Sequence, residues 1–169
     1  RLTETLKGSY VDTSPKDPGD PSRASFNPLA PKAEWKSRRM ALQLILREMC
    51  QVGEHDGHGC AIIERLVVDL FKKFELEPPD VEPTLSDAYR YLTMHKLYDE
   101  INESRLAEKQ NDIRINLGRW THTASRGNSP WAVLLDNPRT TVSLENDMIT
   151  FDILGIEGDE RLENVMFFV

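Results

Sequence analysis

The densest group of side chains that could do chemistry lies between residues 50 and 60. It comprises Cys50, Glu54, His55, Asp56, His58 and Cys60. Zinc prefers thiolate and imidazole ligands, so Cys50, His55, His58 and Cys60 could hold it as a tetrahedral set. The spacing Cys-x4-His-x2-His-x-Cys leaves almost no chain for two chelating turns, and the cysteines also suit the facing ends of two helices as small apolar side chains. A zinc site and a polar loop between helices therefore both stay open.

Other catalytic patterns point away from chemistry within this chain. The sequence has no Gly-x-Ser-x-Gly, and we expect His95 and His122 to be surface residues or helix-end caps. It also lacks Gly-x4-Gly-Lys-Ser/Thr, whose backbone amides would hold phosphate groups. We therefore expect no catalytic, cofactor-binding or nucleotide-binding residues here, and no ATP binding by the chain alone.

The composition is that of a folded, water-soluble protein. The 169 residues carry 21 basic and 28 acidic side chains, for a net charge of −7, and 39% are apolar. No window approaches the ~18 consecutive apolar residues of a membrane span. Residues 127–169 hold two basic and eight acidic side chains, which disfavours binding to a phosphate backbone there. The two cysteines indicate free thiols in a reducing cytosol.

Basic side chains gather once, near one predicted helix, and they interleave with Glu34 and Glu48. We interpret this cluster as a solvated helix face and predict no direct nucleic-acid site. Its members are Lys32, Lys36, Arg38, Arg39 and Arg47.

The spacing of apolar residues predicts a helical region over residues 32–125, after a Pro/Gly-rich extended loop with short strands over residues 1–31. The helices are expected over residues 33–52, 60–76 and 85–96, with one long exposed helix or two short ones between 98 and 120. Leu66 and Leu70 lie on the widest apolar stripe, which marks the core helix. Thr84 and Asp87 are spaced as a capping box for the third helix.

Beyond Trp120 the alternation of side chains predicts strands. They are expected over Trp131–Leu135, Thr140–Leu144 and Met148–Leu154, with the last two forming a β-hairpin around Asn146 and Asp147. A final helix would begin near Asp159. Residues 126–169 therefore read as strands followed by the start of a helix, and the chain as an α/β fold.

The first and last residues favour a piece of a longer protein. The sequence starts at Arg1 without an initiator Met or an export signal, and it stops inside the apolar run from Val165 to Val169.

Four short segments, taken in order, resemble the ATPases that power conjugative DNA transfer and type IV secretion. Leu135, Asn137 and the pair Ser129-Pro130 depart from the family pattern, which favours Phe, Gly and a glycine there. The four segments are Ser25-Phe26-Asn27-Pro28-Leu29, Pro83-Thr84-Leu85-Ser86-Asp87, Trp131-Ala132-Val133-Leu134-Leu135-Asp136-Asn137 and Met148-Ile149-Thr150-Phe151-Asp152-Ile153.

The resemblance implies a helical insertion of about four helices on a RecA-like P-loop core, with the hairpin and terminal strands in the core's sheet. The phosphate-binding loop and the acidic magnesium-binding strand would lie outside this chain. ATP and Mg²⁺ are thus expected for the parent, a hexamer that couples hydrolysis to moving DNA or protein. It would be cytoplasmic, at the inner face of the inner membrane through its partners.

Within such a parent, this segment would be inactive alone and would contact secretion-system proteins and the parent's own subunits. The alternative is a free-standing helical protein-protein interaction domain that binds no nucleotide.

Overall fold

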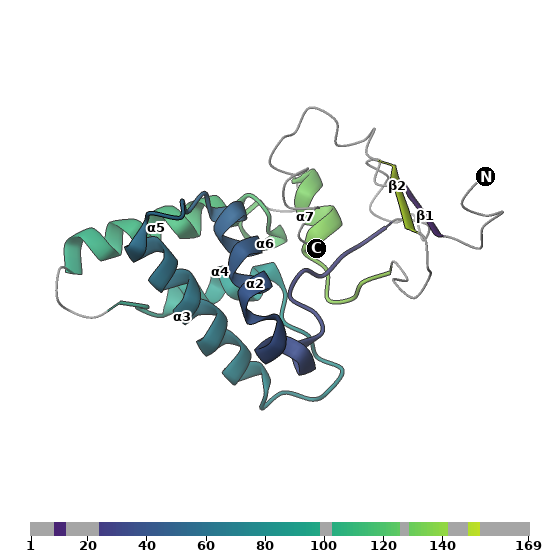
Figure 1. Ribbon diagram of the computed structural model, residues 1–169, viewed down its shortest axis with the longest axis horizontal. Coiled ribbons are helices and arrows are strands. Elements are labelled where there is room, and N and C mark those ends of the chain that lie inside the picture. Colours follow the sequence, from purple (N-terminus) through teal and green to yellow (C-terminus); the bar gives the residue numbers. More distant parts are fainter. Residues whose placement is uncertain (1–8, 13–23, 99–102, 126–128, 142–148, 153–169) are drawn as a thin grey trace.

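The computed structural model describes residues 9–12, 24–98, 103–125, 129–141 and 149–152. Helices α2 to α6 gather into one helical body, while α7 lies between that body and a pair of short strands (Figure 1). The elements in chain order are β1 (Ser9–Asp12), the 3-10 helix η1 (Lys32–Glu34), α2 (Trp35–Cys50), α3 (Gly57–Phe74), α4 (Leu85–Met94), α5 (Glu103–Gly118), α6 (His122–Ser125), α7 (Pro130–Leu135) and β2 (Ile149–Asp152).

Helices α2 and α3 form the centre of the helical body, as their apolar spacing predicts. The stripe of α3 that contains Leu66 and Leu70 is fully buried. The Trp35 ring, at the start of α2, stacks on Phe71 with 5.6 Å between ring centroids. Its indole Nε1 donates a hydrogen bond of 2.9 Å to Glu75 Oε1 just beyond α3, so the polar end of the ring is also satisfied.

Helices α4 and α5 cover this pair, and their ends are fixed by side chains. The predicted capping box is confirmed: the Thr84 side chain accepts from the Asp87 amide, and the Asp87 carboxylate accepts from the Thr84 amide. One helix, α5, occupies most of the span for which one or two helices were expected. Its buried Gln110 accepts a hydrogen bond from Leu97 N and donates to Leu92 O, which satisfies backbone groups at the end of α4.

The prediction of a strand over Trp131–Leu135 is wrong, because these residues lie in α7. A short apolar run does not distinguish a strand from a buried helix turn by its pattern alone. The residues in front of it decide: Ser129 caps the helix by accepting from the Ala132 amide, and Pro130 occupies the first helical position.

The prediction of an α/β fold with a β-hairpin is likewise wrong, because the described chain is mainly helical. Strand β2 falls inside the predicted Met148–Leu154 strand, but it pairs in parallel with β1, from Ser9 opposite Ile149 to Asp12 opposite Asp152. Thr140 and Thr141 are not in a strand. The proposed turn at Asn146 and Asp147 and the helix beginning near Asp159 lie outside the described residues.

None of the helices in the described ranges combines the length and the apolar character that crossing a bilayer requires.

Candidate functional site

The residues considered for zinc form the loop that joins α2 to α3. Cys50 is the last residue of α2 and is 2% exposed, and its burial raises the pKa of the thiol far above the ordinary value. The Cys60 thiol lies 3.7 Å from the Gly53 carbonyl oxygen. Within the ranges that the structure describes, no three His, Cys, Asp or Glu side chains are grouped as metal ligands.

Asp56 is the organising side chain of this loop. Its carboxylate accepts a hydrogen bond of 2.9 Å from the Gly59 amide in the first turn of α3, and it forms an ion pair with Lys109 of α5. Burial raises the pKa of Asp56, but the Lys109 ammonium and the Gly59 amide lower it by more, so the pKa lies below its ordinary value. The loop thereby ties α3 to α5.

The two other histidines lie at helix ends, as expected: His95 at the end of α4 and His122 at the start of α6. The exposed His95 ring packs on Tyr91, with 4.2 Å between centroids. His122 contributes its backbone N–H to the Asp136 carboxylate.

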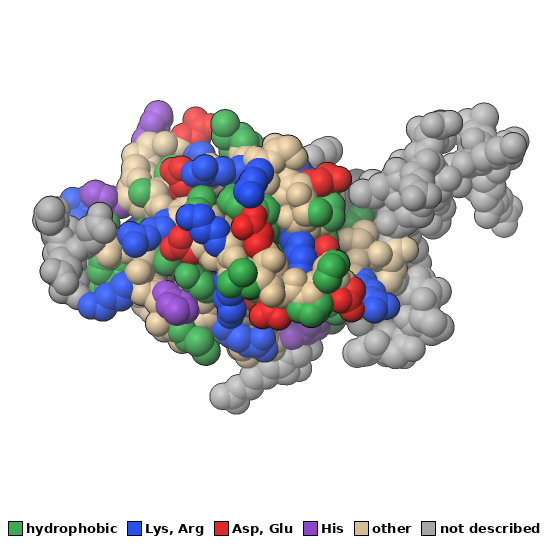
Figure 2. All heavy atoms as spheres, turned by 90° about the horizontal axis from the view of Figure 1, so that it is seen from below, with side chains coloured by type: hydrophobic (Ala, Val, Ile, Leu, Met, Phe, Trp, Pro, Cys, Tyr) green, Lys and Arg blue, Asp and Glu red, His purple; other side chains and the backbone are tan. Residues whose placement is uncertain are grey.

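Two of the five basic side chains in this cluster form ion pairs within the fold. Lys36 pairs with Glu75 at 2.9 Å, and Arg39 pairs with Glu64. Lys32 donates to three backbone carbonyls beyond the end of α3, from Glu77 to Val81. On the face shown in Figure 2, basic and acidic side chains are interleaved.

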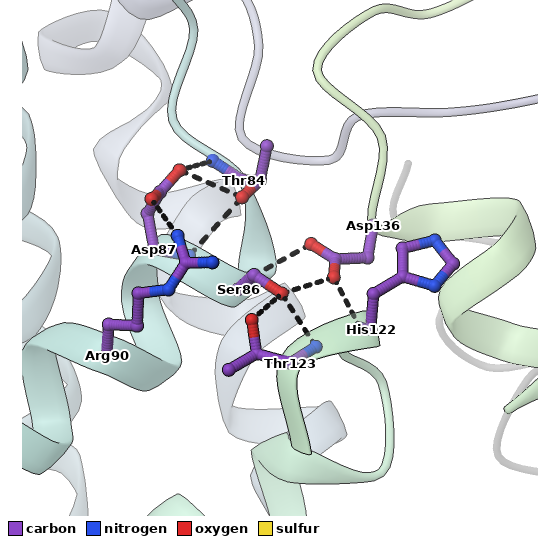
Figure 3. Close-up of polar contacts among 7 residues, drawn as sticks. All are labelled: Thr84, Ser86, Asp87, Arg90, His122, Thr123 and Asp136. Carbon is purple, nitrogen blue, oxygen red and sulfur yellow. Dashed lines mark hydrogen bonds and ion pairs between the residues drawn. The ribbon is translucent and has the colours of Figure 1, made fainter. Parts of the chain in front are cut away.

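A buried carboxylate joins α4, α6 and the end of α7. Asp136 is 5% exposed; its Oδ1 accepts from Ser86 N at 2.8 Å, and its Oδ2 accepts from Ser86 Oγ and from His122 N, each at 2.6 Å (Figure 3). Ser86 lies in the first turn of α4, and His122 begins α6. A carboxylate suits this position because amides at helix starts are unpaired and carry partial positive charge. We call this group the Asp136 junction.

The junction contains the residue types of a catalytic triad without its geometry. Ser86 Oγ donates to the carboxylate and accepts from Thr123 Oγ1 at 2.8 Å. His122 is held by its backbone amide, and its imidazole points away from Ser86 in Figure 3. The contacts of the junction hold the start of α6 against the start of α4.

The chain enters and leaves the helical body at one place. The entry segment, Ser25–Leu29, runs beside the exit segment, residues 134–141. Phe26 N donates to Leu134 O at 2.7 Å, and Thr141 N donates to Ser25 O at 2.9 Å. The buried Asn27 side chain adds a bond of 2.9 Å to Pro83 O, ahead of α4. Entry, exit and the start of α4 therefore form one connected joint.

A groove opens between α4, α5, α6 and the start of α7, and we call it the α4–α6 groove. Its volume is about 550 Å³. The Asp136 junction holds α6, which forms one of its walls. The side chains that give the groove its character are Tyr89, Arg114, Ile115, Arg119, Ala124 and Trp131.

The groove combines apolar surface with two cations. Arg114 lies 5.6 Å from the Tyr89 ring centroid and donates to the Tyr89 hydroxyl at 2.9 Å. The exposed Arg119 guanidinium forms no ion pair with any residue that the structure describes. Ile115 is 49% exposed, and Trp131 stacks on the buried Trp120 with 4.7 Å between centroids. None of the described lining residues is acidic.

Sequence reasoning missed this groove because its residues come from four separate segments. The available signal was weak: Ile115 is an apolar residue on the polar side of a helix that was expected to be mostly exposed. Comparison of the chain with protein-family models, curated proteins and solved structures returns no significant match.

Proposed function

We propose that this chain is a partner-contacting helical region of an ATPase that drives conjugative DNA transfer or type IV secretion. In this role the chain does not hydrolyse ATP. It transmits contacts between the ATPase, its other subunits and secretion-system proteins, while ATP and Mg²⁺ bind elsewhere in the parent protein.

The observation that carries the proposal is the meeting of the family-like segments. Three of them lie far apart in the sequence, around residues 27, 84 and 134, yet they contact one another. Asn27 bonds to Pro83, Phe26 bonds to Leu134, and Ser86 bonds to Asp136. Each segment alone is a weak signal, but together they form the joint through which the helical body is attached.

The paired entry and exit segments support a contact role for the helices. The two connecting segments lie side by side, so the helical body would be attached to the rest of the protein at one side. The remaining surface would then be free to contact other molecules. The α4–α6 groove lies on that remaining surface, beside the Asp136 junction. A partner bound in the groove would therefore act on elements that are tied directly to the joint.

One observation favours the alternative of a free-standing interaction domain. The buried core extends without interruption from Ala24 through α2, α3, α4 and α5 to Leu135. A core of this kind can support a fold without a sheet.

The test compares the chain with the complete gene product that contains it. We expect the complete product to hydrolyse ATP in a Mg²⁺-dependent reaction, and the 169-residue chain, checked for helix content by circular dichroism, to give no heat of ATP binding by calorimetry. A complete product that neither binds nor hydrolyses ATP would refute the ATPase proposal and favour the free-standing domain. ATP binding by the chain alone would contradict the assignment of the nucleotide site to other residues.

A further inference from the structure

We propose that the α4–α6 groove binds an acidic segment of a partner protein, with an apolar side chain of that segment in the groove and its carboxylates on Arg114 and Arg119. This inference rests on the proposed contact function and adds the chemistry of the partner.

The groove carries two guanidinium groups, those of Arg114 and Arg119. Five basic side chains elsewhere in the helical body pair with carboxylates of the same chain, and the pairs are Lys36 with Glu75, Arg39 with Glu64, Arg65 with Asp69, Arg90 with Asp87 and Lys109 with Asp56. In the groove, Arg114 is held by the neutral groups of Tyr89 and Asn111, and Arg119 has no ion-pair partner among the described residues. Two guanidinium groups that lack an ion-pair partner among the described residues favour an anionic ligand.

The groove also contains apolar surface beside these arginines. Ile115 is half-exposed, and the Tyr89 and Trp131 rings are half-buried in the groove wall. Aromatic and arginine side chains are enriched where protein interfaces carry most of their binding energy. A purely ionic ligand, such as free phosphate, would leave this apolar surface in water. A peptide with alternating acidic and apolar side chains satisfies both features.

Two of the long side chains of the groove are held in place before any ligand binds. Arg114 is already oriented by Tyr89 and Asn111, and Trp131 by its stack on Trp120. A ligand would therefore bind without ordering these long side chains, which lowers the entropic cost of association.

The charge of the whole chain favours an acidic peptide segment over a nucleic acid. Both carry negative charge, but the net charge of −7 opposes the long phosphate backbone of a nucleic acid more than it opposes a short peptide that neutralises two arginines. Basic and acidic side chains are also interleaved on the face in Figure 2, so that face shows no continuous basic strip along which a nucleic-acid backbone could bind.

Binding can be measured with a fluorescein-labelled peptide of three Glu-Leu-Asp-Phe repeats, by anisotropy with the full chain. We expect saturable binding that weakens at least about tenfold when the acids are replaced by Gln and Asn, since tenfold corresponds to about 1.4 kcal/mol, the scale of one charge-assisted contact. Arg119→Glu should weaken binding of the acidic peptide by about tenfold or more. The matched control is Arg139→Glu, an exposed charge reversal outside the groove, which should change binding less than about twofold.

A second variant, Ile115→Ser, removes apolar surface without changing charge. It should weaken the binding of both the acidic peptide and the neutral Gln/Asn peptide. The inference is overturned if the acidic peptide does not bind, if the neutral peptide binds equally well, or if Arg119→Glu and Arg139→Glu have equal effects. Displacement of the peptide by single-stranded DNA with higher affinity would assign the groove to nucleic acid and also overturn it. Peptide binding does not depend on ATP hydrolysis by the complete product, so the two proposals can fail separately.

Discussion

Replacing Asp136 by Asn tests the junction that holds α4, α6 and α7 together. The carboxylate accepts three hydrogen bonds, from Ser86 N, Ser86 Oγ and His122 N. An Asn side chain has nearly the same shape. Its carbonyl oxygen can keep the bond to Ser86 N, but its NH₂ group then faces the His122 amide, which is also a donor.

The expected loss follows from these contacts. A hydrogen bond to a charged group contributes about 1.5–3 kcal/mol, and Asp136→Asn weakens two of the three. The Ser86 hydroxyl can rotate to accept from the new amide, and His122 is only half-buried, so water can reach its N–H group. We therefore expect the free energy of unfolding to fall by about 2–4 kcal/mol.

Urea unfolding followed by circular dichroism measures this change. With a denaturant slope near 2 kcal/mol/M, the unfolding midpoint should fall by about 1–2 M. Asp112→Asn is the control, because it removes the same charge from an exposed site on α5, and it should change stability by less than about 0.5 kcal/mol. Ser86→Ala combined with Asp136→Asn should cost less than the sum of the single variants. If the Asp136→Asn variant is as stable as the unsubstituted chain, the junction does not hold the helices together.

Three further predictions concern packing and charge. Leu66→Ala should lower the free energy of unfolding by about 2–5 kcal/mol, because Leu66 is fully buried in α3; a loss below about 0.5 kcal/mol would contradict the core assignment. Gly118→Ala should cost about 1–3 kcal/mol, since the new Cβ would lie 3.0 Å from the Ala124 Cβ, and an unchanged melting temperature would count against this close approach. Asp56→Asn should destabilise the chain at pH 7, where the lowered pKa of Asp56 makes its ion pair with Lys109 stabilising. That stabilisation is lost as the pH falls through the folded-state pKa of Asp56. The difference in urea midpoint between the variant and the unsubstituted chain should therefore shrink below about pH 4. A difference that stays constant with pH would refute the assignment.

The long helices could be predicted from the sequence because their signals are local. The apolar stripe of α3 repeats over five turns, and the capping box at Thr84 and Asp87 marks the start of α4 within four residues. In contrast, α7 is too short to show a helical period. Ser129 at the cap position and Pro130 at the first helical position are the sequence signals for this helix. The apolar, β-branched residues that follow favour a strand instead and so hide these signals.

The junction and the groove could not be predicted, because their contacts join distant positions. Asp136 lies 50 residues from Ser86 and 14 from His122, and neither spacing belongs to a helix or a hairpin. The pairing of β1 with β2 spans an even longer separation, which is why a local hairpin was the wrong expectation for β2. Sequence patterns indicate which residues are buried, but the choice of a distant partner depends on how the helices pack.

The closeness of the two connections has a practical consequence for engineering. Hydrogen-bonded backbones such as those of Ser25 and Thr141 lie about 5 Å apart, the spacing of neighbouring strands. We therefore expect that residues 25–141 can be inserted as one unit into another protein. A surface turn of an unrelated host protein could accept them, because the two attachment points need be no farther apart than the ends of a hairpin loop. In the donor protein, a few glycines could join the two chain ends that the removal of residues 25–141 leaves.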